Sequence, residues 1–464
     1  MAQLGNSAAS RDIAHVLHPY TNLKAHEETG PLIITEGKGV WVYDESGKAY
    51  IEGLAGLWCT SLGFGEERLV EAAAQQMRKL PYFHTFFSRS HNPVIDLAEK
   101  IIGMAPVLMS HVFFANSGSE ATDSAVKFAW YYNHALGRPE KRKIISRIKG
   151  YHGVTVAAAS LCGLPNNHRD FGLPIDGILH TDCPHHYRFG VAGESEEDFA
   201  TRMAANLEQM IADEGPETIA AFIAEPVMGA GGVIVPPKTY FEKIQPILKK
   251  HDILFIVDEV ICGFGRTGNM FGTQTYNLEP DMICIAKALS SAYLPISGIM
   301  LNEKVYSVVR ENSNKIGLFG HGFTYSGHPV AAAVALETLK IYEERDIVSQ
   351  VRAVAPALQD GLRKLSDRPF VGEVRGVGLM AAIEMVKNKE TKENFDPALG
   401  IGAYLAGRAQ EHGILLRPIG GDVVAFSPPL VITAAEIGEL VDRFTKALDD
   451  TVAYIEDQGF ADAN

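Results

Sequence analysis

The sequence predicts an α/β protein whose larger part is built on a mostly parallel sheet. Between residues 110 and 300, short apolar runs typical of strands alternate with helical patterns. HVFFA precedes EATDSAVKFAWYYNHAL, KIISR precedes TVAAASL, and AAFIAEP precedes TYFEKIQPILKKHD, before the runs ILFIVDE and MICIAK. Such alternation indicates a parallel sheet with helices on both faces.

The two ends of the chain predict a second, smaller α+β part. Residues 38–55, KGVWVYDESGKAYIEGLA, are typical of a hairpin around a Glu-Ser-Gly turn. After SGHP come a small-residue helix, a strand in GLMAAIEM, a helix near 399–412, a strand in VVAFSPP and a final amphipathic helix. We expect residues 1–65 and 329–464 to form the small domain, and residues 66–328 the large, cofactor-binding one.

Composition excludes several classes of protein. The formal net charge of −14 in 464 residues argues against nucleic acid or anionic lipid as the main partner, because the field would repel phosphate. The five cysteines are scattered and odd in number, which favours a reducing cytoplasm over a disulfide framework. The N-terminus lacks a signal-peptide pattern, and no apolar run approaches the roughly 18 residues of a membrane span.

The segment CPHHYRFG at residues 183–190 clusters one cysteine and two histidines. A structural zinc ion normally needs four well-spaced ligands, and no second cluster is evident. We therefore predict a surface loop here and no metal site.

Polar residues that end the apolar runs are the candidate site, because ligands bind beyond the carboxyl ends of parallel strands. In FFANSGSEA a strand stops before Ser117, Gly118 and Ser119, and a helix begins near Glu120. Backbone amides and two hydroxyls at a helix N-terminus make a phosphate cradle, although a plain serine cap is the simpler alternative.

Four further residues end strands or follow them. Tyr151, in the turn KGYHG, could lay its ring on a flat ligand or be an exposed turn aromatic. Glu225 and Asp258 are carboxylates that need partners if buried, and backbone amides are the common ones. Lys287 usually would reach water at such a position, but in a crevice it becomes a neutral nucleophile suited to Schiff-base formation.

Together these groups match one cofactor. A phosphate cradle, a stacking ring, a buried carboxylate and a reactive lysine are what a phosphorylated heteroaromatic aldehyde needs. The sequence therefore predicts pyridoxal 5'-phosphate (PLP) as the cofactor.

A competing motif, GFGRTG at residues 263–268, satisfies the dinucleotide-binding pattern G-x-G-x-x-G. In that fold the glycines open a helix directly, whereas NMFGTQTYN follows here and has poor helix formers. A dinucleotide-binding function would also leave Lys287 unexplained, and we expect no nicotinamide site.

With these residues, the chain resembles the class-III PLP-dependent aminotransferases, and within them the ω-amino acid:pyruvate and amine:pyruvate transaminases. The motifs NSGSEA, YHG, AEPV, DEVICGFGRTG, AKALSS and GFTYSGHP occur in family order. The resemblance extends from GVWVYDESGKAYIEGLAGLWC to SPPLVIT. It implies an aspartate-aminotransferase-like PLP fold whose small domain draws on both termini.

The resemblance also implies roles. Lys287 would carry the cofactor covalently and move a proton during catalysis, while Asp258 would pair with the pyridine nitrogen. The cofactor contacts that it implies are Ser117, Gly118, Ser119, Tyr151, His152, Glu225, Asp258, Val260, Lys287 and Thr324.

Within that set, Tyr151 and Val260 would cover the two ring faces, and Glu225 would support the surrounding network. Thr324, in GFTYSGHP, would bind the phosphate of the cofactor in the neighbouring subunit. The resemblance therefore implies a homodimer with shared active sites.

The same resemblance suggests substrate contacts. Arg417, in GILLRPIG, matches a mobile arginine that clamps a substrate carboxylate, although an exposed loop arginine is the alternative. Trp58 and Phe86 match aromatic walls of the pocket, although core packing would explain either. Ala292 and Ser297 depart from the family pattern, which more often has glycine at both positions.

We therefore expect a cytoplasmic, homodimeric transaminase that moves an amino group from an ω-amino acid, diamine or amine to pyruvate in a ping-pong cycle. Another reaction on the same fold stays open, such as an aminomutase, a decarboxylase or a transaminase with a different keto-acid acceptor. So does a non-catalytic or nucleotide-binding protein that retains the scaffold.

Overall fold

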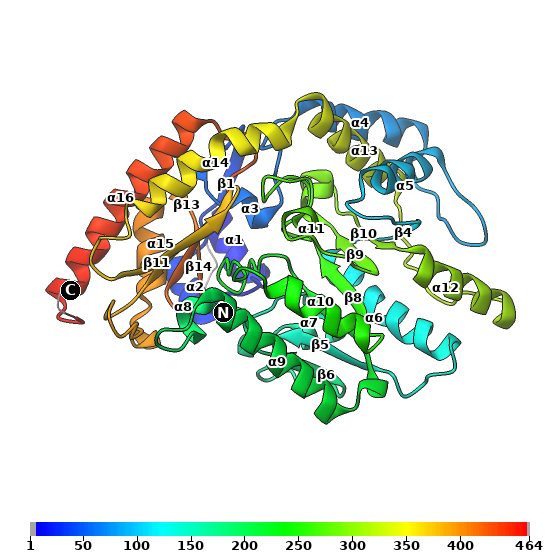
Figure 1. Cartoon of the computed structure of the whole chain (residues 1–464). Helices are drawn as coiled ribbons and strands as arrows, with labels where there is room; N and C mark the ends of the chain where they lie inside the picture. The colour runs from blue at the N-terminus through cyan, green and yellow to red at the C-terminus, as the bar shows by residue number, and fades with distance from the viewer. Residues whose placement is uncertain (1–5, 462–464) are drawn as a thin grey trace.

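A seven-stranded sheet lies at the centre of the computed structural model, which describes residues 6–461 (Figure 1). Its order is β4-β10-β9-β8-β7-β5-β6, in which only β10 runs antiparallel to its neighbours. The strands are β4 (His111–Ala115), β5 (Lys143–Arg147), β6 (Ile178–Thr181), β7 (Ile219–Ala224), β8 (Leu254–Asp258), β9 (Met282–Ile285) and β10 (Ser297–Leu301). The predicted, mostly parallel sheet is confirmed.

Both faces of this sheet are buried, which explains why its strands are apolar without alternation. On β5, Ile144 packs with α6 (Gly118–Ala135) on one face, while Ile145 packs with α9 (Glu196–Glu214) and α10 (Tyr240–Lys250) on the other. Adjacent residues of β7 and β8 divide between the same two clusters. The sheet is therefore the middle of three layers.

A smaller sheet joins the two ends of the chain. The predicted hairpin is confirmed, since β2 pairs antiparallel with β3. From the other end of the sequence, β13 adds in parallel to β3. The four strands are β1 (Ile34–Lys38), β2 (Trp41–Asp44), β3 (Ala49–Glu52) and β13 (Ile414–Leu415).

A third sheet, antiparallel throughout, contains the predicted C-terminal strands. Its order is β11 (Val371–Val377), β12 (Met380–Met385), β15 (Val423–Phe426) and β14 (Arg417–Ile419). The helices that accompany it are α14 (Ile347–Arg363), α15 (Ile401–Glu411) and the amphipathic α16 (Ala434–Asp457). The two smaller sheets thus take strands from both ends of the chain, and the predicted domain boundaries stay predictions.

Helix α13 (Pro329–Glu344) connects the large and small sheets and packs on α4 (Glu67–Lys79) and α5 (Asn92–Met104). The remaining helices are α1 (Ala8–His15), α2 (Leu23–Thr29), α3 (Ala55–Trp58), α7 (Val156–Leu161), α8 (His186–Phe189), α11 (Gly272–Thr275) and α12 (Glu303–Ile316). Within residues 6–461, no helix combines the length and hydropathy needed to cross a lipid bilayer.

The glycine motif at residues 263–268 forms a buried turn, and no helix starts there. Gly265 and Gly268 have φ angles of +104° and +88°, which only glycine adopts readily. Glu259, just after β8, accepts hydrogen bonds from the backbone amides of Gly272 (3.0 Å) and Thr273 (2.5 Å). A buried carboxylate therefore fixes the loop that follows the glycine motif.

The prediction of a surface loop at residues 183–190 is wrong. His185 is only 3% exposed, and its Nε2 lies 2.8 Å from Oε2 of Glu373 on β11. Arg375 donates from Nη1 to Glu373 and Glu384, at 2.5 Å in each case. The loop is buried because the third sheet supplies charged partners for its polar groups, and the sequence alone does not reveal them.

The buried Glu259 predicts a pH dependence of stability. Burial raises the pKa of Glu259 from its usual 4.5 to about 7. Between these values the folded chain keeps a proton that the unfolded chain has released, so the free energy of unfolding falls as the pH rises. Glu259→Gln removes this decrease in the free energy of unfolding, which amounts to about 3 kcal/mol.

We therefore expect the urea midpoint of Glu259→Gln to rise relative to that of the unmodified protein between about pH 5 and about pH 8. The exposed Glu99→Gln serves as the control and should show a constant difference. A constant difference for Glu259→Gln as well would contradict this assignment.

Candidate active site

The carboxyl ends of β4, β7, β8 and β9 surround a cavity of about 120 Å³. Eight of its lining residues belong to the predicted cofactor site. The lining comprises Gly118, Ser119, Tyr151, His152, Gly153, Glu225, Asp258, Val260, Ile261 and Lys287. Segments that are far apart in sequence therefore meet beyond the carboxyl ends of the strands, where the ligand site was predicted.

The N-terminus of α6 forms one wall of this cavity. Ser117 caps the helix by accepting from the Glu120 amide (3.2 Å), while Ser119 Oγ accepts from the Val154 amide (3.0 Å). The amides of Gly118 and Ser119 have no intrahelical acceptor, because the first turn of a helix leaves its N–H groups free. This arrangement suits an anion.

Close backbone approach requires glycine opposite this turn. Gly153 has a φ of +131°, and a Cβ there would lie 2.5 Å from Ser119 Oγ. Any larger residue would therefore displace the anion cradle.

Asp258, the last residue of β8, is held from two sides. Its Oδ1 accepts from the Val260 amide (3.0 Å), and its Oδ2 accepts from Nδ1 of His152 (2.8 Å). Asp258 and His152 are both at least 96% buried. The carboxylate is thus fixed in orientation at the base of the cavity.

Glu225, at the end of β7, anchors the turn that carries Tyr151. Its Oε1 accepts from the Tyr151 amide and its Oε2 from the Gly229 amide, both at 3.0 Å. Burial raises the pKa of Glu225. The predicted hydrogen bonds from backbone amides to the Glu225 carboxylate are therefore confirmed. Glu225 also lines the cavity.

Lys287 begins the 3-10 turn Lys287–Ser290 and has a φ of +50°, which is costly for a residue with a side chain. Burial lowers the pKa of Lys287, although the nearby Asp258 carboxylate opposes this effect. The turn is held by Tyr342 of α13, whose hydroxyl donates to the Ala288 carbonyl (2.6 Å). The fold thus presents a partly desolvated amine in a fixed position.

The structure explains one of the two departures from the family pattern. The buried Ser297 donates from Oγ to the Ser117 carbonyl (2.7 Å), which ties β10 to the cap of α6. Ala292 is exposed and has a φ of +62°, and nothing in the structure explains a residue other than glycine there.

Thr324 and Phe86 lie outside the cavity. Thr324 is exposed in the loop before α13, and its carbonyl accepts from the Tyr82 hydroxyl (2.7 Å). Phe86 is 38% exposed and contacts the same loop, at a groove of about 660 Å³. A single chain therefore does not bring these two residues to Lys287.

Trp58 ends α3, and Arg417 begins β14 of the third sheet. Trp58 is 3% exposed and packs in the cluster that contains Ile261, which lines the cavity. Arg417 begins β14, and its guanidinium carbon lies 5.7 Å from the centre of the Tyr20 ring.

Tyr20, which the sequence did not single out, neighbours two of the predicted site residues, Tyr151 and Arg417. Its hydroxyl accepts from Asn167 Nδ2 (3.0 Å), and it neighbours Tyr151. Burial and then the Tyr20 hydroxyl raise the pKa of Tyr151. No pattern around HPY signals this, because its contacts with residues 151, 167 and 417 arise only in the folded chain.

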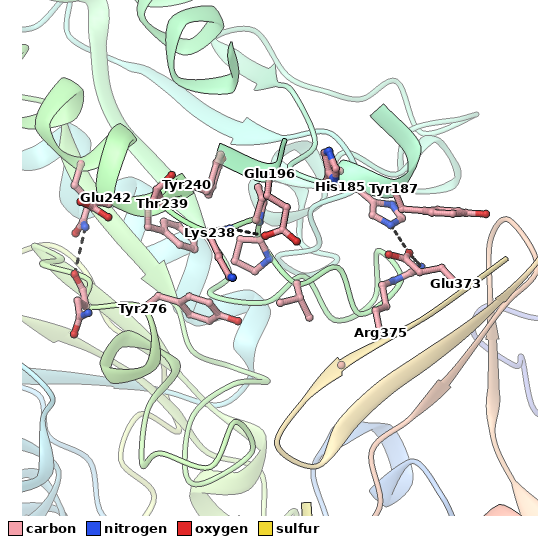
Figure 2. A pocket seen from close by; sticks show the side chains of 18 of the residues that line it. His185, Tyr187, Glu196, Lys238, Thr239, Tyr240, Glu242, Tyr276, Glu373 and Arg375 are labelled. Carbon is pink, nitrogen blue, oxygen red and sulfur yellow. Dashed lines mark hydrogen bonds and ion pairs between the residues drawn. The ribbon is translucent and has the colours of Figure 1, made fainter. Parts of the chain in front are cut away.

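A much larger cavity, of about 1210 Å³, lies elsewhere, beside α10 and β11 (Figure 2). It is lined by side chains of both charges, including Lys238, Glu242, Glu373 and Arg375. None of the residues predicted for the cofactor site lies there, so the smaller cavity at the strand ends is the candidate active site.

The residues at the strand ends fit PLP. The cradle at Ser119 suits a phosphate, Asp258 suits a protonated ring nitrogen, and Lys287 suits an aldehyde carbon. The space that a Cβ on Gly153 would fill lies beside the cradle. Tyr151 and Val260 line the same cavity and are available for the two faces of a ring.

Comparison with known proteins agrees with this fit. The sequence model of the family "Aminotransferase class-III" matches residues 23–448. Gamma aminobutyrate transaminase 3, chloroplastic, from Solanum lycopersicum is 54% identical over 443 residues, which cover 95% of this chain and 85% of the relative.

Solved structures are equally similar. The ω transaminase from Pseudomonas jessenii in complex with PMP is 57% identical, with a TM-score of 0.96, over 97% of this chain and 99% of that one. The variant W58M/F86L/R417L of the thermostable ω transaminase PjTA-R6, engineered for asymmetric synthesis of bulky amines, is 56% identical, with a TM-score of 0.95, over 97% of this chain and 100% of that one.

The contact between Gly153 and Ser119 yields a prediction. Gly153→Ala would push against Ser119 and strain a left-handed backbone, so we expect PLP affinity to fall by about 10- to 100-fold. Titration of the cofactor-free protein with PLP, followed by absorbance, measures this.

Gly137→Ala is the control, because Gly137 also has a positive φ but no neighbour within 4 Å of a Cβ. It should lose a little stability and no PLP affinity. Equal affinity in the two variants would show that the close approach at Gly153 does not shape the cradle.

Proposed function

The chain belongs to the class-III aminotransferases, and we propose that it moves an amino group from an ω-amino acid, diamine or simple amine to pyruvate in a ping-pong cycle. The observation that carries this proposal is the single cavity shared by Lys287, Asp258 and the N-terminus of α6. Class-III aminotransferases depend on PLP, which supplies an electron sink for the removal of a proton from the substrate carbon.

The residues around the cavity bind and orient the cofactor in this proposal. The amides of Gly118 and Ser119, with the Ser119 hydroxyl, bind the phosphate. Asp258, oriented by His152, pairs with the pyridine nitrogen and keeps it protonated. Tyr151 and Val260 pack on the two ring faces and keep water away from them.

Lys287 acts as the nucleophile and then as the proton carrier. Its lowered pKa favours a neutral amine, which is the form that attacks a carbonyl and accepts a proton. Lys287 lines the cavity, and the Tyr342 hydroxyl fixes the turn that Lys287 begins. The neutral Lys287 amine would accept the proton that the substrate carbon releases and hold it for return to the cofactor's aldehyde carbon.

Arg417 and the aromatic residues select the substrate. In this proposal Arg417 clamps the carboxylate of the keto acid and moves aside for an amine that has none. The relatives named γ-aminobutyrate transaminases support an ω-amino acid as one donor. The engineered variant W58M/F86L/R417L of the ω transaminase PjTA-R6 supports Trp58, Phe86 and Arg417 as pocket residues, because this chain has the same residue types at those numbers.

We place a second copy of the chain over the loops of Phe86 and Thr324, so that the site is completed in a homodimer. Large apolar side chains are exposed on these loops, including Phe87 (76%), Leu318 (62%) and Tyr325 (60%). Phe87 and Leu318 line one groove, and exposed apolar surface of this kind is typical of an interface. A cytoplasmic location fits the five free cysteines and remains part of the proposal.

The direct test is a donor panel with pyruvate, read by alanine formation. We expect turnover with γ-aminobutyrate, a diamine or an arylalkylamine, and none in Lys287→Ala. Parallel reactions with 2-oxoglutarate or glyoxylate identify a different acceptor. Rearrangement or loss of carbon dioxide without amino transfer would support an aminomutase or a decarboxylase and contradict the proposal.

Substitution of Arg417 tests carboxylate binding. We expect Arg417→Met to raise the KM for pyruvate by about 10- to 100-fold, because a charge-assisted bidentate contact is lost. The kcat with a simple amine donor at saturating pyruvate should change little. Arg78→Met, on exposed α4, is the control, and an unchanged KM in Arg417→Met would exclude the clamp.

A further inference from the structure

Three metal-ligating side chains converge at the N-terminal segment, outside the candidate active site. Oδ1 of Asp12, on α1, lies 2.8 Å from Nε2 of His18 and 3.1 Å from Nε2 of His26, on α2. The three side chains are 22%, 28% and 10% exposed, respectively. Each imidazole thus points its Nε2 atom at Oδ1 of Asp12.

We propose that Asp12, His18 and His26 bind a divalent transition-metal ion such as Zn²⁺, which fastens the N-terminal segment and holds Tyr20 at the mouth of the active site. Two imidazole nitrogens and one carboxylate oxygen form a donor set typical of zinc. A solvent molecule takes the fourth position, which the partial exposure of the cluster leaves open.

The geometry needs little change to admit the ion. Ligand atoms around a tetrahedral ion at about 2.0–2.1 Å stand a little over 3 Å apart, and the present separations are 2.8 and 3.1 Å. All three ligand atoms lie within 4.8 Å of one another. Each imidazole would coordinate through Nε2 and keep its proton on Nδ1, so the ion replaces two N–H hydrogen bonds.

A second histidine and carboxylate cluster has no such room. His185, Glu373 and Glu384 also converge, but Arg375 donates to both carboxylates and fills the space between them. Figure 2 shows Arg375 beside Glu373 and His185. Two guanidinium groups, those of Arg375 and Arg188, already neutralise the two carboxylates of that cluster. By contrast, no lysine or arginine forms an ion pair with Asp12 in the part of the chain that the structure describes.

The N-terminal segment has few other means of attachment. Neither α1 nor α2 has a buried residue, although both helices are capped. Burial of apolar surface therefore contributes little to holding them, and the hydrogen bond from His26 to Asp12 joins the two helices. An ion bound there would stabilise the segment because it binds only the folded arrangement.

Tyr20 lies between two of the proposed ligands in sequence. It contacts Arg417 and neighbours Tyr151 at the candidate active site. Because Arg417 begins β14, this contact places Tyr20 against the start of that strand. Fastening His18 to His26 therefore restricts the loop that carries Tyr20, independently of which substrate the enzyme uses.

Zinc titration of the chelator-treated holoenzyme tests the site. We expect one high-affinity Zn²⁺ per chain by isothermal calorimetry, and a loss of about 100-fold in affinity in His26→Gln and in Asp12→Asn. His15→Gln, an exposed histidine at the end of α1, is the matched control and should bind as the unmodified protein does. Equal zinc affinity in all four proteins would overturn the proposal.

Hydrogen exchange tests the fastening without reference to activity. Zinc should slow exchange across residues 8–29 of the unmodified protein, and should have no effect on that segment in His26→Gln. Unchanged exchange in the zinc-bound unmodified protein would overturn the fastening role. Because neither readout uses turnover, their failure is distinguishable from failure of the proposed transaminase function.

Discussion

The hydrogen bond between His152 and Asp258 is the interaction on which the candidate site depends. A carboxylate taken out of water costs free energy unless it is paired, and here the imidazole and the Val260 amide supply the partners. This pairing fixes an anion at the end of β8, opposite a lysine whose amine is itself partly desolvated. The chemistry of a carbonyl cofactor needs both groups in place before substrate arrives.

The sheet brings these groups together because its parallel strands end at one edge. Most of this could be predicted from the sequence, since Ser119, Glu225, Asp258 and Lys287 all follow apolar runs. Runs buried on both faces are easy to recognise as strands of a covered sheet. The predicted hairpin and the C-terminal strands were recognisable for a similar reason, because their turns and periodicity are local.

What the sequence could not predict depends on contacts between distant segments. From the sequence, His185 was predicted to lie in a surface loop. In the folded chain Glu373 and Arg375, nearly 190 residues later, bury it. Tyr20 carries no local signal, and its neighbours at 151, 167 and 417 come from three different parts of the fold. Phe86 and Thr324 were predicted from the family resemblance alone, and in one chain they lie away from the cavity.

The most direct test of the central claim is to find where the cofactor attaches. The purified yellow protein is reduced with borohydride and digested, and its peptides are analysed by mass spectrometry. The account predicts a single pyridoxyl group on Lys287, in the peptide that follows β9. A pyridoxyl group on another lysine, or none in protein that retains transaminase activity, would contradict it.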